Sequence, residues 1–295
     1  MEPPTYLAKK HKHPRDKRIV FDEGPHIYYI DGDDSYTSCT TWNHSHFPHF
    51  NPHKIIKNMM NSKKWPDSKY FGMTPDQIKA LWKENGRKAS EAGTKMHYDI
   101  ECFYNDEEVE VDEDCIEWTY FENFEEDYGQ HLKPYRTEWT VFDEDMKIAG
   151  SIDMIYEKPN GHLLIYDWKR CKEIKKTNNF ESANKECISH LPNSNYWHYA
   201  LQLNTYKAIL ERKYGKKVDG LFLVCLHPNN FNKNYQRIEV PHLKTEMDNL
   251  IKERIAEIKL QKTLVCDTCY TDKNVKQYNK NCYGERELSD NCLKI

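Results

Sequence analysis

Two aspartates and a lysine lie close together in a part of the sequence whose residue types favour β-strands. Asp153 ends the run AGSID, and Asp167 and Lys169 lie two residues apart in the run LIYDWK. Because alternate residues of a strand point to the same face, Asp167 and Lys169 share a face, and Asp153 is within reach of it if the two strands pair in an ordinary register. The sequence thus predicts two carboxylates and an ammonium group at one end of a β-hairpin.

Such a group of side chains suits a hard divalent cation. Mg²⁺ or Mn²⁺ prefers oxygen ligands, typically takes one or two carboxylates, and keeps several waters and a substrate phosphate. The ion polarises a scissile phosphate and lowers the pKa of a bound water. Lys169 then orients or helps to deprotonate that water, or neutralises charge developing on the phosphate. The alternative is an ordinary salt-bridged hairpin in which Lys169 pairs with both acids, because Asp-x-Lys alone is a common pattern.

Two further pairs of residues have the spacing of neighbours on a helix. His97 and Glu101 lie four residues apart and so share one helical face. A neutral imidazole there can be a metal ligand, and Glu101 can hold the ring or a metal-bound water. Gln202 and Tyr206 repeat the spacing further along the chain. The alternatives are an ordinary core or surface histidine, and a polar pair satisfied at a helix–sheet junction.

Hydrophobic periodicity predicts the elements that must position these side chains. The expected core elements are, in chain order, helices at about 85–104 and 114–128, strands at 136–142, 147–156 and 162–169, a helix at 195–214, a strand at 218–226 and an amphipathic helix at 243–262. The turn Pro159-Asn160-Gly161 makes a hairpin of the second and third strands. This order indicates an α/β fold in which helices cover a mixed sheet.

The chain divides into four segments by composition. Residues 1–18 read as a basic flexible arm, and residues 19–84 as an N-terminal elaboration with a hairpin around the turn 31–34 and a capped helix that starts at Thr74. Residues 85–262 form the predicted core, and residues 263–295 a cysteine-containing tail.

Composition narrows the class of protein. The chain has 295 residues, 38% of them apolar and 31% charged, with 20 Tyr and 7 Trp, as expected of a folded soluble protein. No apolar run is long enough for a membrane span, and the N-terminus lacks the pattern of a secretory signal. We therefore expect an intracellular location (cytoplasm, nucleus or a viral factory). The net charge of −4 gives no global attraction to a polyanion.

In combination, these motifs resemble one known family. The series G-x-x-x-H-x-x-x-E, G-x-x-D, D-x-K and Q-x-x-x-Y is similar to the RecB-type branch of the PD-(D/E)xK nuclease superfamily and spans roughly residues 86–226. Relatives of this type include the mitochondrial genome-maintenance exonuclease, lambda exonuclease and CRISPR-associated adaptation nucleases. The N-terminal part is loosely similar to nucleases of large DNA viruses. The resemblance implies a restriction-endonuclease-like core.

The resemblance also implies roles for individual residues. The metal ligands it implies are His97, Asp153, Asp167 and the backbone carbonyl of Trp168, with Glu138 as a secondary acid on the preceding strand. The catalytic residues it implies are Asp153, Asp167, Lys169, Glu101, Gln202 and Tyr206. Gln202 and Tyr206 contact DNA or brace the site. A basic cluster begins inside the site, and the further contacts to nucleic acid are expected from Lys95, Arg170 and Lys172.

Ten cysteines without a secretory signal are more typical of free thiols or a metal site than of disulfides. Some RecB-type nucleases carry a four-cysteine iron–sulfur cluster, and four cysteines lie in the tail, at Cys266, Cys269, Cys282 and Cys292. Their spacing departs from the family pattern, so unligated thiols are favoured over Zn²⁺ or a cluster.

The activity expected from these motifs is metal-dependent hydrolysis of DNA, with trimming of DNA ends favoured because most stand-alone proteins of this type act there. The alternatives are a structure-specific or RNA-cleaving endonuclease and, less favoured because Asp153, Asp167 and Lys169 are intact, a non-catalytic DNA-binding protein. Polarity and oligomeric state are not indicated by any residue.

Overall fold

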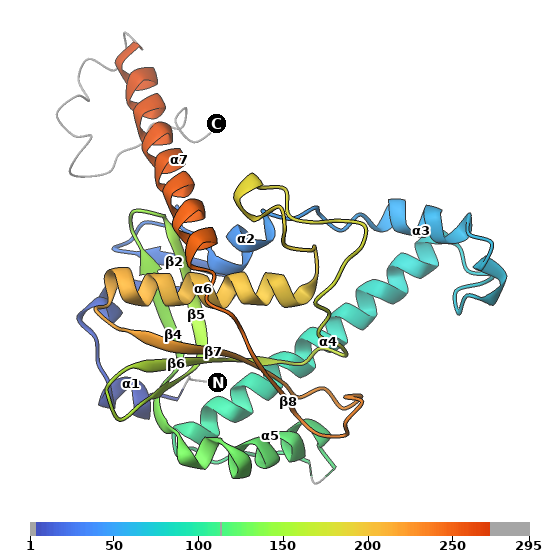
Figure 1. The fold of residues 1–295 in the computed structure, drawn as a ribbon, viewed down its shortest axis with the longest axis horizontal. Coiled ribbons are helices and arrows are strands. Elements are labelled where there is room, and N and C mark those ends of the chain that lie inside the picture. Colours follow the sequence, from blue (N-terminus) through green and yellow to red (C-terminus); the bar gives the residue numbers. More distant parts are fainter. Residues whose placement is uncertain (1–3, 113, 272–295) are drawn as a thin grey trace. The chain divides into compact units, whose positions relative to one another are not determined.

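The computed structural model describes residues 4–112 and 114–271, with side chains to residue 263 (Figure 1). A mixed sheet forms its centre. The strands of this sheet are β3 (Thr37–Ser38), β4 (Lys133–Asp143), β5 (Ile148–Glu157), β6 (Leu163–Lys169), β7 (Val218–Cys225) and β8 (Gln236–Glu239). The α-helices are α1 (Tyr6–Lys10), α2 (Cys39–His44), α3 (Pro52–Met60), α4 (Pro75–Tyr104), α5 (Ile116–Asp127), α6 (Asn195–Lys213) and α7 (Lys244–Thr271).

The sheet follows the predicted order of elements. Strands β4, β5 and β6 pair in antiparallel fashion, β6 and β7 pair in parallel, and β8 adds an antiparallel edge. Parallel strands need a crossover, and α6 provides it between β6 and β7. The two-residue strand β3 pairs in parallel with the beginning of β5. The fold is therefore the mixed α/β core expected from the sequence, with β3 and β8 as additions.

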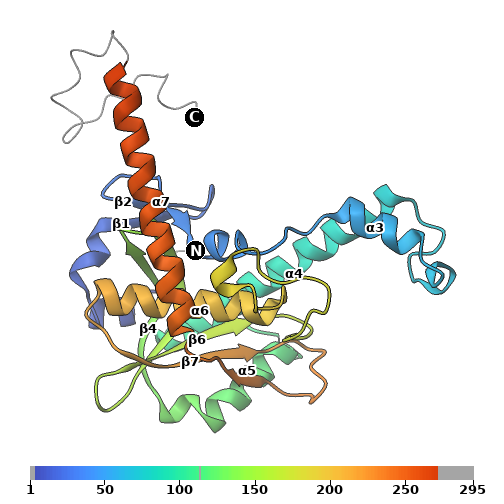
Figure 2. The same ribbon diagram turned by 45° about the horizontal axis from the view of Figure 1, so that its top comes forward.

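Helices cover both faces of the sheet. One apolar cluster joins α4 and α5 to alternate residues of β5, β6 and β7, including Tyr156, Trp168 and Phe222. On the opposite face α6 contacts β4, β6 and β7, and Figure 2 shows α6 and α5 on opposite sides of β6 and β7. Both faces of β7 are therefore buried, which explains why this strand reads as a nearly continuous apolar run.

Two N-terminal expectations are wrong. The hairpin pairs β1 (Ile19–Asp22) with β2 (Ile27–Ile30), so its turn lies at residues 23–26 and not at 31–34. The expected flexible arm is folded, because α1 and the 3-10 helix Pro14–Arg18 pack on the core. Leu7 is buried, and Asp16 accepts hydrogen bonds from Arg136 and Trp139 of β4. Because this segment is rich in lysine and arginine, its sequence did not indicate that Leu7 and Asp16 attach it to the core.

The structure joins the two expected helices between residues 74 and 104 into one. Thr74 caps α4 with the predicted capping box, and the helix then continues for 30 residues to Tyr104. A glycine in an exposed helix costs only about 1 kcal/mol, so Gly86 does not end it. The same helix therefore connects the N-terminal elaboration to His97.

Three further 3-10 turns lie in connections. They are Trp65–Asp67 after α3, Gly129–His131 after α5 and Glu186–Ile188 before α6. The first compact unit ends at Met247 inside α7. None of the described helices combines the length and apolar composition that a membrane crossing requires.

Candidate active site

The site lies where β5 and β6 separate. These strands pair only from Met154 and Tyr166 to Glu157 and Leu163. Immediately beyond that pairing, the Asp153 carboxylate accepts a hydrogen bond from the backbone N–H of Trp168 (2.9 Å). The Asp153 side chain thus takes the place of the next backbone hydrogen bond between the strands. The opening between the strands places Asp153 and Asp167 at one end of the hairpin.

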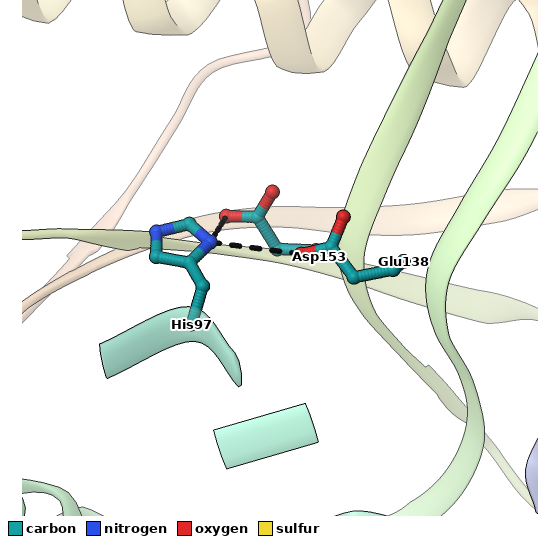
Figure 3. Close-up of side chains that lie close together, drawn as sticks. All are labelled: His97, Glu138 and Asp153. Atoms are coloured by element: carbon teal, nitrogen blue, oxygen red, sulfur yellow. Dashed lines mark ion pairs between the residues drawn. The ribbon is translucent and has the colours of Figure 1, made fainter. Parts of the chain in front are cut away.

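His97 approaches this opening from α4. Its Nδ1 lies 3.6 Å from Glu138 Oε1 and 3.6 Å from Asp153 Oδ2. Figure 3 shows the ring pointing toward both carboxylates. Its Nε2 lies 3.0 Å from the carbonyl oxygen of Trp168. A histidine that ligates a metal commonly donates its other ring N–H to a carbonyl. The arrangement therefore leaves Nδ1 facing the carboxylates and fixes the ring through the carbonyl of Trp168.

Glu138 reaches the cluster through an unusual backbone conformation. In the β4–β5 register Thr137 pairs with Met154 and Trp139 with Ile152, so Glu138 lies across from Asp153. Its φ of 40° is left-handed, which is uncommon for a residue with a Cβ and marks local strain. The Ser151 hydroxyl donates a hydrogen bond to Glu138 Oε2 (2.7 Å). Strain and this hydrogen bond together aim the carboxylate at His97.

Asp167 and Lys169 lie on the face of β6 that α6 covers. The Lys169 ammonium is 2.5 Å from Asp167 Oδ2 and also lies over the ring of Tyr199, 4.8 Å from its centroid. This ion pair engages Oδ2, whereas the buried Oδ1 of Asp167 has no hydrogen-bond partner among the described residues. Buried carboxylate oxygens are normally satisfied, so Oδ1 is available to a ligand.

The site concentrates negative charge. Burial and the neighbouring Asp167 raise the pKa of Asp153 to about 7, and burial and Glu138 raise the pKa of Glu101 to about 7. Burial opposes protonation of His97, but Asp153 and Glu138 outweigh it and raise the pKa of His97 to about 9. Burial also disfavours the charge on Lys169, yet Asp167 and Asp153 raise its pKa.

These residues fit a divalent cation. Ligand atoms of His97, Glu138 and Asp153 lie within 4.8 Å of one another, and Asp167 Oδ1 has no hydrogen-bond partner among the described residues. In the described part of the chain, four carboxylates, including that of Glu101, surround two groups that can carry positive charge, His97 and Lys169. A cation of charge +2 balances that excess, and oxygen-rich sites of this kind suit Mg²⁺ or Mn²⁺.

The second predicted helical pair lies deeper than a surface contact. Gln202 donates a hydrogen bond to the Tyr206 hydroxyl (3.2 Å), and Tyr206 is 3% exposed. The Tyr206 ring packs so closely on β5 that a Cβ at Gly150 would lie 2.8 Å from its Cε1 atom. Of the two roles expected for Tyr206, this position favours bracing of β5 over contact with nucleic acid.

The three basic residues expected to contact nucleic acid differ in their surroundings. Lys95 pairs with Asp99, and Arg170 donates a hydrogen bond to Glu117. Lys172 is exposed. The predicted cysteine site lies outside the residues whose side chains are described, because Cys282 and Cys292 fall beyond residue 271 and Cys266 and Cys269 beyond residue 263.

Two side chains that hold the site, Ser151 and Tyr199, were not predicted from the sequence. Ser151 precedes Asp153 by two residues and so shares its strand face, a signal that was present in the sequence. Tyr199 lies three residues before Gln202 on α6, but nothing in the sequence indicated that its ring would lie under Lys169.

Comparison with known proteins identifies the family. The family model described as the PD-(D/E)XK nuclease superfamily matches residues 72–272, more than half of the chain. The chain belongs to the PD-(D/E)XK nuclease superfamily, as the resemblance of its motifs predicted. A search of curated protein sequences found no match to this chain.

A solved structure is also similar to this chain. It is a protein of Eubacterium rectale described as a "Putative exonuclease", with 13% sequence identity over 88% of this chain and 93% of the other. The TM-score is 0.34. Nothing about substrate is carried over from a likeness at that level.

Proposed function

We propose that this chain is a Mg²⁺- or Mn²⁺-dependent deoxyribonuclease that degrades DNA from its ends, in replication, recombination or repair. The observation that carries the proposal is the convergence of His97, Glu138 and Asp153 beside a buried Asp167 whose Oδ1 has no hydrogen-bond partner among the described residues. A nuclease of this superfamily hydrolyses phosphodiester bonds, and the acidic group supplies the site for a divalent cation.

Each residue has a distinct part in this proposal. His97, Asp153 and Asp167, with Glu138, would hold the ion, and the ion would polarise the phosphate and lower the pKa of a bound water. The carbonyl of Trp168 orients His97 and remains a predicted ligand. Lys169, held by Asp167 and Tyr199, neutralises negative charge that develops on the phosphate. Glu101 is the fourth carboxylate of the site, and Gln202 and Tyr206 support β5.

The decisive experiment compares end-labelled linear DNA with closed circular DNA of the same sequence, each incubated with Mg²⁺ or Mn²⁺. An enzyme that needs ends releases label from the linear substrate and leaves the covalently closed circle intact. Cutting of the closed circle would instead show an endonuclease. A labelled RNA of the same sequence, run in parallel, tests the assignment to DNA, and EDTA must abolish all cleavage.

A further inference from the structure

A positively charged segment lies away from the active site, in the N-terminal elaboration. Residues 50–83 contain seven lysines and two aspartates, a formal charge of +5, whereas the whole chain carries −4. These residues form α3, the turn Trp65–Asp67 and the first part of α4. Helices α3 and α4 contact one another, and Figures 1 and 2 both show α3 beside the N-terminal end of α4.

Most of these lysines are free to bind a polyanion. Six of them are exposed, and none of the six has an ion-pair partner among the residues described: Lys54, Lys57, Lys63, Lys64, Lys69 and Lys83. Only Lys79 of the seven is paired, with Asp76. Basic side chains that are not neutralised by neighbouring acids attract phosphate groups over long range.

Aromatic rings lie among the lysines. Phe50 is 69% exposed and Phe71 is 59% exposed, so both rings are accessible to a ligand. Both rings rest on partly buried ones, since Phe50 packs on Trp82 and Phe71 on Trp65. Trp82 is itself fixed by a hydrogen bond from its Nε1 to the Tyr70 hydroxyl (3.0 Å). These rings are therefore presented on a supported surface.

We infer that this α3–α4 surface, formed by residues 50–83, binds an unpaired DNA strand whose other part occupies the active site. Exposed rings among lysines are the combination that binds single strands, because bases stack on the rings and phosphates pair with the ammonium groups. Unpaired bases offer open faces for stacking, which bases inside a duplex do not. This inference rests on the proposed function, because it assigns the substrate strand to this surface.

The continuity of α4 sets the spacing between the two sites. Trp82 and His97 lie fifteen residues apart on one helix, which corresponds to about 22 Å at 1.5 Å per residue. A strand with the rise of B-form DNA, 3.4 Å per nucleotide, spans this distance with roughly seven nucleotides. Oligonucleotides much shorter than that cannot occupy both places at once.

The test measures binding in EDTA, so that it does not depend on cleavage. The probes are fluorescein-labelled single-stranded oligodeoxynucleotides of 5 and 15 nucleotides and a duplex of about 15 base pairs, and the readout is anisotropy across a salt series. The variants are F50A/F71A and K57Q/K63Q/K64Q, with K217Q as a matched control. Lys217 is exposed and directly precedes β7. The active-site residue Lys169 pairs with Cys225, which lies at the other end of that strand.

Loss of both rings is expected to weaken binding of the 15-mer by tenfold or more, with an unchanged salt slope. Loss of the three lysines is expected to reduce the slope of log affinity against log salt by about 2, at roughly 0.7 per phosphate contact. The 5-mer is too short to reach both places, so the wild type should bind it more weakly than it binds the 15-mer. Melting curves establish that the variants fold, which the exposure of both phenylalanines favours.

Two results would overturn the inference. One is equal binding of the 15-mer by the wild type and both surface variants. The other is a loss of duplex binding as large as the loss of single-strand binding, since the surface would then recognise phosphates alone. Because these measurements contain no metal, a protein that binds the strand at this surface but never cleaves DNA contradicts the proposed function and leaves the inference standing.

Discussion

At the scale of single residues, the site depends on two acidic residues whose backbone conformation or burial is energetically unfavourable. Glu138 adopts a left-handed backbone conformation, and Asp167 is buried with no hydrogen-bond partner for its Oδ1 in the described structure. Departures of this kind from ordinary packing cluster at functional sites, where a ligand or substrate compensates for them. The two departures lie on β4 and β6, on either side of Asp153.

The first prediction concerns Lys169. Lys169→Gln removes the only ammonium group near Asp167 among the described residues, so charge developing on the phosphate is no longer neutralised, and we expect kcat to fall by roughly 10²–10³-fold or more. Asp167→Asn should have a comparable effect, and DNA binding in EDTA should survive in both variants. Lys217→Gln is the control. Near-wild-type cleavage by either site variant would show that the assignment is wrong.

A second prediction separates positioning from ligation. Ser151→Ala removes the hydrogen bond that holds Glu138 Oε2 without removing any carboxylate. Outer hydrogen bonds of this kind are worth about 10–100-fold in metal affinity, so the Mn²⁺ concentration needed for half-maximal cleavage should rise by that factor while the rate at saturating Mn²⁺ changes little. Ser189→Ala, in an exposed turn, is the matched control. A loss of rate that saturating Mn²⁺ does not restore would contradict a positioning role.

At the scale of elements, the site exists because β5 can lie close to α6. Gly150 provides that proximity, since an added Cβ would meet the Tyr206 ring at 2.8 Å and Cys39 Cβ at 3.0 Å. The glycine in the G-x-x-D motif thus has a packing reason that is independent of its neighbour Asp153. It allows α6 and α2 to support the strand that carries Asp153.

The third prediction compares two glycines. Gly150→Ala overpacks a buried contact and should lower the free energy of unfolding by about 1–3 kcal/mol. Gly86→Ala, in exposed α4 with open space around the new Cβ, should raise it by about 0.5–1 kcal/mol. Denaturant melts of both variants measure the difference. Equal stability of Gly150→Ala and the wild type would mean that the Tyr206 ring moves aside readily.

The same elements show how far the sequence could predict this fold. Period-two alternation placed Asp167 and Lys169 on one face, and the cap at Thr74 marked the start of α4. Strand β3 has two residues, too few to form a pattern, and its pairing with β5 is decided by tertiary contacts. The conformation of Glu138 likewise depends on its surroundings, so its place beside His97 could be suggested only by resemblance.

At the scale of the whole molecule, charge is distributed unevenly. The residues at 50–83 are strongly basic, whereas the rest of the chain is acidic and its site holds four carboxylates. Repulsion within that site destabilises the metal-free fold, a cost that an enzyme accepts where function requires it. Removing one carboxylate should therefore relieve the metal-free protein even as it weakens metal binding.

The last prediction tests these two opposite effects of removing a carboxylate on stability, with and without metal. Mn²⁺ at one hundred times its dissociation constant should stabilise the wild type by about 2.7 kcal/mol, which raises the Tm by roughly 5–10 °C for a domain of this size. Without metal, Asp153→Asn should melt at or above the wild-type temperature, because it lacks one of the repelling charges. It should gain little from Mn²⁺, because it also lacks a ligand. Asp34→Asn, at an exposed position, should behave as the wild type in both conditions. Differential scanning fluorimetry of the three proteins, with EDTA and with Mn²⁺, measures all six temperatures. A full Mn²⁺-dependent rise in Asp153→Asn would place the ion elsewhere in the chain.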